Sequence, residues 1–186
     1  MASRAGRRIL LAGTGIALAS MGLGALLRWQ VTRPPAPAAE PELPGPAQPV
    51  DIWNLSFPTP GGSELAMSAF RGRPLVLNFW ATWCAPCIEE MPLLDAFARE
   101  QRGAGWNVVG LALDGAAPVQ EFLRRTPVGF AIGLAQGQGV RLSRSLGNTR
   151  GALPFSIAFN IQGEAFARKL GALNAQELSA WASQIS

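Results

Sequence analysis

The stretch LNFWATWCAPCIEEMP, residues 77–92, contains the only two cysteines of this 186-residue chain, Cys84 and Cys87. Just before them, residues 75–81 read LVLNFWA, an almost continuous apolar run that predicts a buried strand. Just after them, residues 84–102 predict a helix, because Cys87, Met91 and Leu94 recur along one apolar stripe. The cysteine pair is therefore expected at the junction between a buried strand and the helix that follows it.

This placement of the two cysteines suits reversible disulfide chemistry. Residues i and i+3 on a helix have Cβ atoms about 5 to 6 Å apart, so small adjustments can make or break an S–S bond. A thiol at a helix N-terminus also faces unpaired N–H groups and the positive end of the helix dipole, which stabilise a thiolate. We therefore expect Cys84 to be the exposed nucleophile and Cys87, one turn further on, to be the buried resolving thiol.

The alternative is that the two cysteines form a purely structural disulfide in a non-enzymatic binding module. Exported domains often use structural disulfides. A ring of only four residues, however, stabilises a fold by only about 2 kcal/mol in the loop-closure model, whereas a longer loop would contribute more. The chain has no other cysteine with which to close a longer loop, so we favour the redox interpretation.

Strands and helices alternate through the rest of the chain. Further strands are predicted at residues 106–113, 129–134, 155–160 and 164–170, and further helices at residues 117–125, 140–146 and from Asn174 onward, where Glu177 completes a capping box. The pattern predicts an α/β domain with a central mixed sheet and helices on both faces. Residues 52–57 and a short strand at Leu65 are expected to add an N-terminal β-hairpin.

Composition and charge exclude several other functions. The chain has no histidine, which excludes a histidine-based catalytic triad and, with only two cysteines, argues against a protein zinc site. From residue 51 onward there are eleven basic and ten acidic residues, so 11 − 10 leaves a net charge of +1. This nearly neutral body lacks the basic stripe of a nucleic-acid binder, and no nucleic-acid partner is expected.

The N-terminal part of the chain predicts a membrane anchor. Residues 9–27 form a run of 19 residues without charge, long enough as a helix to span a bilayer, and arginines before it place the N-terminus in the cytoplasm. The alternative is a cleaved signal peptide, but the best cleavage site, residues 36–38, lies far beyond the apolar run. We thus divide the chain into a cytoplasmic tip and transmembrane anchor at residues 1–30, a Pro/Ala-rich linker at 31–50, and a folded domain at 51–186.

The motif residues resemble the TlpA/ResA family of thioredoxin-like, membrane-anchored thiol-disulfide oxidoreductases. The resemblance rests on LNFWATWCAPCIEEMP at 77–92 and GALPFSIAFN at 151–160, and Pro92 matches the helix-kinking proline of thioredoxin-like proteins. It implies a thioredoxin-like fold, with Leu153-Pro154 as a cis peptide bond facing the active site. It also implies that an extended substrate segment pairs beside that bond. We assign substrate binding to Trp83, Ala85, Pro86, Leu153 and Pro154.

The resemblance also implies a proton-exchanging acid. Thioredoxin itself carries an aspartate in the strand before the motif, where this chain has Asn78, an amide that cannot exchange a proton. Glu90 lies three residues after Cys87, on the same side as the apolar stripe, and matches a glutamate of the ResA-like relatives. We therefore assign Glu90 proton exchange with the thiols. The alternative is an exposed acid in the first helical turn, where a negative charge favours the helix dipole.

The function implied is thiol-disulfide exchange in the periplasm, on the outer side of the bacterial cytoplasmic membrane, with Cys84, Cys87 and Glu90 as catalytic residues. No cofactor and no metal is needed. The Ala85-Pro86 dipeptide resembles that of thioredoxin, which favours a protein disulfide reductase over an oxidase or isomerase. Relatives reduce apocytochromes c or the assembly proteins of copper sites, so these are the expected substrates, with a membrane-embedded protein as the expected electron donor.

Overall fold

The computed structural model describes residues 50–185. The predicted membrane segment at residues 9–27 and the predicted linker up to residue 49 lie outside this range. None of the helices within the range is both long and apolar enough to cross a membrane.

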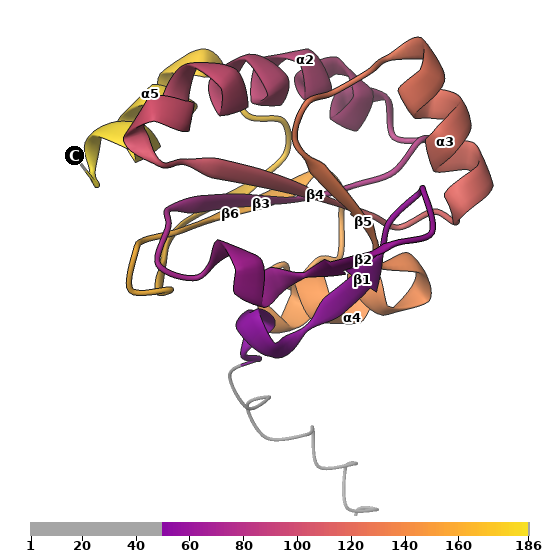
Figure 1. The fold of residues 1–186 in the computed structure, drawn as a ribbon, viewed down its shortest axis with the longest axis horizontal. Coiled ribbons are helices and arrows are strands. Elements are labelled where there is room, and N and C mark those ends of the chain that lie inside the picture. The colour runs from indigo at the N-terminus through magenta and orange to yellow at the C-terminus, as the bar shows by residue number, and fades with distance from the viewer. Residues whose placement is uncertain (1–49, 186) are drawn as a thin grey trace, which may run out of the picture. The chain divides into compact units, whose positions relative to one another are not determined.

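A five-stranded mixed sheet forms the centre of the domain, as the alternating pattern predicts (Figure 1). Its strand order is β5-β4-β3-β6-β7, with β3, β4 and β5 parallel and with β6 antiparallel to both β3 and β7. The strands are β3 (Leu75–Trp80), β4 (Asn107–Ala112), β5 (Ala131–Leu134), β6 (Phe155–Phe159) and β7 (Ala165–Leu170). Strand β3 lies in the middle with all six residues buried, which explains its nearly continuous apolar sequence.

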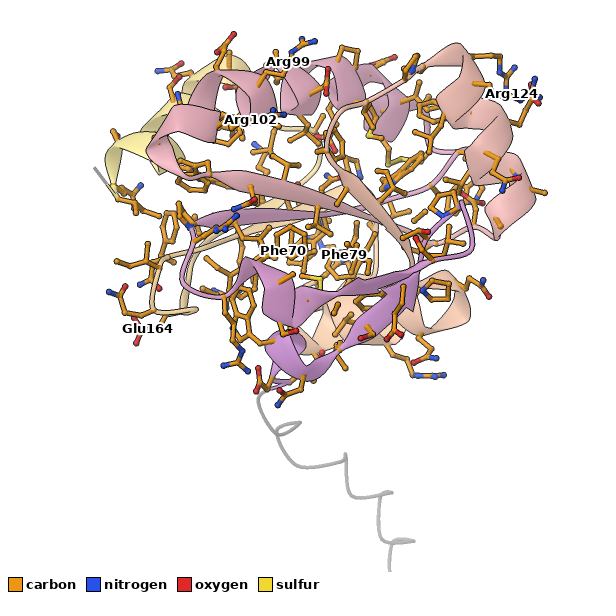
Figure 2. The ribbon with its side chains drawn as sticks, viewed as in Figure 1. Phe70, Phe79, Arg99, Arg102, Arg124 and Glu164 are labelled. Atoms are coloured by element: carbon orange, nitrogen blue, oxygen red, sulfur yellow. A yellow bond between two sulfur atoms is a disulfide. The ribbon has the colours of Figure 1, made fainter. Side chains whose placement is uncertain are left out.

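Helices cover both faces of this sheet (Figure 1). On one face lie α2 (Ala85–Glu100), α3 (Ala116–Arg125) and α5 (Ala175–Ser183), and on the other lie α4 (Gln136–Ser145) and the antiparallel hairpin of β1 (Ser56–Pro58) and β2 (Glu64–Ala66). Alternate residues of β3 therefore enter two different cores. Val76 and Trp80 pack on the α2 face, and Phe79 packs on the α4 face, inside the molecule (Figure 2).

Helix α2 confirms the predicted buried stripe. Cys87, Met91 and Leu94 are fully buried against the sheet, whereas Arg99 points outward from the same helix (Figure 2). Burying side chains of this size contributes about 1.5–3 kcal/mol each. The helix continues through Pro92, which lies inside it. The apolar stripe therefore fixes the rotation of α2, and with it the face on which the two cysteines and Glu90 lie.

Two element predictions are wrong in detail. Residues 52–57 were expected to form a strand, but Ile52–Asn54 is a 3-10 helix, η1, because the Asp51 carboxylate accepts a hydrogen bond from the Trp53 N–H at 3.0 Å. Further 3-10 turns lie at Met67–Phe70 (η2) and Gln101–Ala104 (η3). Helix α4 begins at Gln136, four residues before the predicted start, although Gly137 and Gly139 lower its helix propensity. A methyl group on Gly139 would lie 2.9 Å from Leu113 Cδ1, so the Leu113 side chain would have to move to admit one.

Candidate active site

The two cysteines form a disulfide across the first turn of α2 (Figure 2). The sulfur atoms lie 2.06 Å apart and the Cα atoms 5.3 Å apart. Cys84 is the N-cap residue of the helix, where no side chain caps the free N–H groups, and Cys87 lies inside the first turn. The strand-to-helix junction thus places one sulfur at the positive end of the helix dipole and the other directly behind it.

The accessibility of the cysteines differs from the expectation in one respect. Cys84 was expected to be exposed, but only 6% of its surface is accessible in the disulfide form, against 0% for Cys87. Its neighbours are the exposed groups: Trp83 retains 70% of its surface, and Ala85 and Pro86 are also exposed. Cys84 is therefore the more accessible of the two cysteines, within an apolar surface made by the residues on either side of it.

The peptide bond between Leu153 and Pro154 is cis, as the resemblance implies. Pro154 is buried, and its carbonyl accepts a hydrogen bond from the Gly171 N–H at 2.8 Å. Leu153 is half-buried and packs against the core that includes both cysteines. Among residues 50–185, no hydrogen bond involves the backbone N–H or C=O of Leu153. The segment before β6 thus offers a donor and an acceptor that an extended peptide can use.

Glu90 lies inside the protein, so the interpretation of it as an exposed acid is wrong. Only 3% of its surface is accessible, whereas its neighbour Glu89 is exposed. One carboxylate oxygen, Oε1, accepts a hydrogen bond from Asn78 Nδ2 at 2.7 Å, and the other, Oε2, accepts one from the Leu173 N–H at 2.8 Å. Burial raises the pKa of Glu90 above its ordinary value, although these two hydrogen bonds lower it.

Asn78 connects Glu90 to strand β6. The register of β3 and β6 pairs Asn78 with Ser156, and Asn78 Nδ2 donates a hydrogen bond to Ser156 Oγ at 2.9 Å. Sequence analysis did not identify Ser156 or Leu173 as part of the site. A signal was present for Ser156, because it is the single polar residue of the buried strand FSIAF. Nothing in the sequence marks Leu173, because it acts through its backbone.

A cleft of about 420 Å³ lies next to the cysteine motif. Its walls come from the residues flanking the motif and from α3, and they are Thr82, Ile88, Pro118, Glu121, Phe122, Arg125 and Thr126. The Thr82 N–H donates a hydrogen bond to Asp114 Oδ2 at 2.6 Å, which fixes the segment leading into the motif. In the part of the chain that the structure describes, no three His, Cys, Asp or Glu side chains gather closely enough to hold a metal ion.

This geometry suits a two-electron dithiol reaction. The disulfide can accept two electrons and two protons, and one turn beyond Cys87 lies a carboxyl whose pKa burial raises. The cysteines lie beside an exposed aromatic side chain and a cleft, which offers a surface to a large substrate.

Comparisons with known proteins agree with this chemistry. The sequence model of the Redoxin family matches residues 36–184. Thiol:disulfide interchange protein DsbE of Tatumella citrea is 32% identical over 161 residues, which cover 83% of this chain and 82% of that protein. Thiol-disulfide oxidoreductase ResA of Bacillus cereus is 24% identical over 126 residues, which cover 67% of this chain and 70% of that protein. Among solved structures, dsbF of MTB superimposes with a TM-score of 0.62 at 25% identity, covering 73% of this chain and 97% of that one. The fold is therefore thioredoxin-like.

Proposed function

The chain belongs to the Redoxin family and is a thiol-disulfide oxidoreductase, and from that premise we propose that Cys84 and Cys87 reduce disulfides in other proteins. The observation that carries the proposal is the Cys84–Cys87 disulfide at the N-terminus of α2, with Cys84 as the more accessible cysteine. A purely structural disulfide would gain nothing from that position, whereas a nucleophilic thiolate is stabilised there.

The reaction proceeds in two exchange steps. In the reduced enzyme, the Cys84 thiolate attacks one sulfur of the target disulfide, which forms a mixed disulfide and releases the other target sulfur as a thiolate that takes up a proton. Cys87 then loses its proton and attacks Cys84 Sγ as a thiolate, which closes the Cys84–Cys87 disulfide and releases the second target sulfur as a thiolate that also takes up a proton. The target gains two electrons, the enzyme loses two, and a membrane-embedded donor restores the dithiol.

Glu90 and Leu153 have supporting roles in this proposal. Glu90 is one helical turn beyond Cys87 and is buried, so it is placed to take the proton that Cys87 loses before its attack. Leu153 offers an unpaired N–H and C=O to an extended substrate segment, and Trp83, Ala85, Pro86 and Pro154 form the apolar surroundings of that segment.

We assign the reaction to the periplasmic side of the bacterial cytoplasmic membrane, because residues 9–27 can span a bilayer with arginines before them. Apocytochrome c and copper-site assembly proteins are the substrate classes. Alkaline phosphatase fused after Val50 tests the location: the fusion should be active in cells, and the unfused protein should remain in membranes after a carbonate wash. A soluble product beginning near residue 39 would contradict a retained anchor.

The exchange mechanism is tested by trapping. A Cys87→Ser variant should attack its target through Cys84 and stall as a mixed disulfide, which can be isolated from cells and its partner identified. Cys84→Ser is the matched control, because it lacks the attacking sulfur and should trap little. A haem-attachment protein in the trap would indicate cytochrome c maturation, and a copper chaperone or oxidase subunit would indicate copper-site assembly. Equal trapping by both variants would contradict the assignment of Cys84 as the nucleophile.

The direction of the reaction is tested by the redox potential of the Cys84–Cys87 pair. A reductase should lie near the thioredoxin value of about −270 mV, whereas strong periplasmic oxidants lie near about −120 mV. Equilibration with glutathione buffers measures this potential. A value near that of the oxidants would favour the oxidase instead.

A further inference from the structure

Three buried polar side chains from three different elements form one hydrogen-bonded group. Asn78 on β3 and Ser156 on β6 are fully buried, and Glu90 on α2 is nearly so. The amide nitrogen of Asn78 donates to both partners, at 2.7 Å to Glu90 Oε1 and at 2.9 Å to Ser156 Oγ. The amide oxygen of Asn78 has no partner, although it is buried. The amide is therefore satisfied on one side only.

An unpaired buried acceptor is unfavourable, so its retention calls for an explanation. Leaving such a group without a hydrogen bond destabilises a fold by about 1–3 kcal/mol. Leucine has the same branching of side-chain heavy atoms as asparagine and carries no polar atom, so it would avoid that penalty, but it could not donate a hydrogen bond to Glu90. The donor side of the amide explains why a polar residue stands at position 78. The amide oxygen, Oδ1, accepts no hydrogen bond as long as Glu90 is ionised.

Protonation of Glu90 changes the hydrogen bonds that its carboxyl group can form. An ionised carboxylate only accepts hydrogen bonds, and here it accepts one from Asn78 and one from Leu173. A carboxylic acid also carries an O–H that must donate. If the proton is on Oε1, the O–H meets the Asn78 N–H, a second donor. The acceptor within the same amide is the unpaired Oδ1, and rotation by half a turn about the Cβ–Cγ bond brings it to Glu90.

Ser156 is compatible with both orientations of the amide. Its hydroxyl can accept a hydrogen bond or donate one. It accepts from Asn78 Nδ2 in this structure, and it can donate to Asn78 Oδ1 after the rotation. The heavy atoms N and O of an amide are nearly equal in size, so the reversed amide keeps its heavy atoms in almost the same positions.

We propose that Asn78 is a positioning residue for Glu90 in both of its protonation states, donating to the carboxylate through Nδ2 and, after the amide reverses, accepting from the carboxylic acid through Oδ1. Ser156 supports either orientation. The proposal rests on the proposed function, in which Glu90 exchanges a proton with Cys87. It gives the buried carboxyl a partner before and after that exchange, so that neither state of Glu90 is left with two donors facing each other.

The charged and titratable groups on the elements next to Glu90 are exposed, disulfide-bonded or paired with one another. On α2 they include Cys87, which is held in the disulfide, and Glu89, which is exposed. On β7, Lys169 pairs across the sheet with Ser156, but its amine forms an ion pair with Glu177 on α5 at 2.5 Å. Strands β3 and β6 contribute only Asn78 and Ser156 to this group. In the oxidised protein, Asn78 is therefore the group whose state should follow that of Glu90.

The test is a pH titration of the oxidised full chain in detergent, followed by NMR. The carboxyl carbon (Cδ) of the glutamates and the side-chain amide nitrogen (Nδ2) of the asparagines carry the isotope labels. Above the titration midpoint of Glu90, we expect nuclear Overhauser contacts between the Asn78 Nδ2 protons and the Ser156 methylene. Below the midpoint, those contacts should disappear. In Glu90→Gln, they should not change with pH. Contacts that persist through the Glu90 midpoint in the wild-type protein would overturn the amide reversal.

A second measurement uses substitutions of buried asparagines. Asn78→Leu removes a hydrogen bond that is stronger to the carboxylate than to the acid, so the Glu90 midpoint should rise by about one pH unit. Asn148→Leu is the matched control, because Asn148 is also buried with an unpaired Oδ1 but bonds Ser143 and Ala152 instead. It should leave the midpoint unchanged. An unchanged midpoint in Asn78→Leu would overturn the positioning role. Both experiments use the oxidised protein without turnover, so their failure is distinct from failure of the trapping experiment.

Discussion

Replacing Glu90 by glutamine should change how the stability of this protein depends on pH. Burial raises the pKa of Glu90 above the value it has in the unfolded chain, near 4.5. Below pH 4.5 the carboxyl is neutral in both the folded and the unfolded chain. As the pH rises through the folded pKa, the unfolded chain releases the proton more readily, so the free energy of unfolding falls. Glu90→Gln has no proton to release at this position and should not show that fall.

The size of the effect follows from the surroundings of the carboxyl. Each pH unit between the folded and unfolded pKa values corresponds to about 1.4 kcal/mol of stability. Burial at 3% accessibility is the larger influence, and the hydrogen bonds from Asn78 and Leu173 reduce it without cancelling it. We therefore expect the stability of Glu90→Gln relative to wild type to improve as the pH rises from 4 to 8, by about 1.4 kcal/mol for each pH unit that separates the folded from the unfolded pKa of Glu90.

Urea unfolding at a series of pH values, followed by tryptophan fluorescence with the disulfide intact, measures this difference. The other carboxyl groups are common to both proteins, so their contributions cancel when the two curves are subtracted. Glu89→Gln is the matched control, because Glu89 is the neighbouring glutamate but is exposed. A constant difference between Glu90→Gln and wild type from pH 4 to pH 8 would refute the argument.

Three further substitutions test other features. Trp83→Ala should slow exchange with protein disulfides while changing the free energy of unfolding by less than about 0.5 kcal/mol, because 70% of the side chain is exposed; equal slowing with dithiothreitol would contradict a role in substrate contact. Gly110→Ala should destabilise the fold by about 1–3 kcal/mol in urea, because the new methyl group would lie 2.8 Å from Ile132 Cδ1. Glu177→Gln should show the opposite pH dependence to Glu90→Gln. The hydrogen bond from Lys169 lowers the pKa of Glu177, so its stabilising contribution in the wild type is present above pH 4.5 and is lost as the pH falls through the folded pKa; a wild-type advantage that persists at pH 2 would contradict this.

Local features of the fold could be predicted because short-range spacing sets them. The apolar run before the cysteines predicts a buried strand, and the stripe through Cys87, Met91 and Leu94 predicts a helix of known rotation. The predicted N-terminal hairpin is present, with Phe57 paired to Leu65, but its first strand begins at Ser56 instead of residue 52. The apolar residues before Ser56 also fit a strand, but they form a 3-10 turn, which the Asp51 side chain caps and which several local hydrogen bonds close.

The sequence by itself determined that Cys84 and Cys87 share the first turn of a helix, and that Glu90 lies on the buried side of that helix, because helical periodicity depends only on neighbouring residues. Only the tertiary structure decided what surrounds the carboxyl. Its partner Asn78 is 12 residues away in the chain and Leu173 is 83 away, while Ser156 lies 78 residues from Asn78. The pairing of β3 with β6, and the packing of the segment before α5 against α2, bring these groups together. Burial and hydrogen bonding across such distances depend on how separate elements pack, which no local spacing encodes.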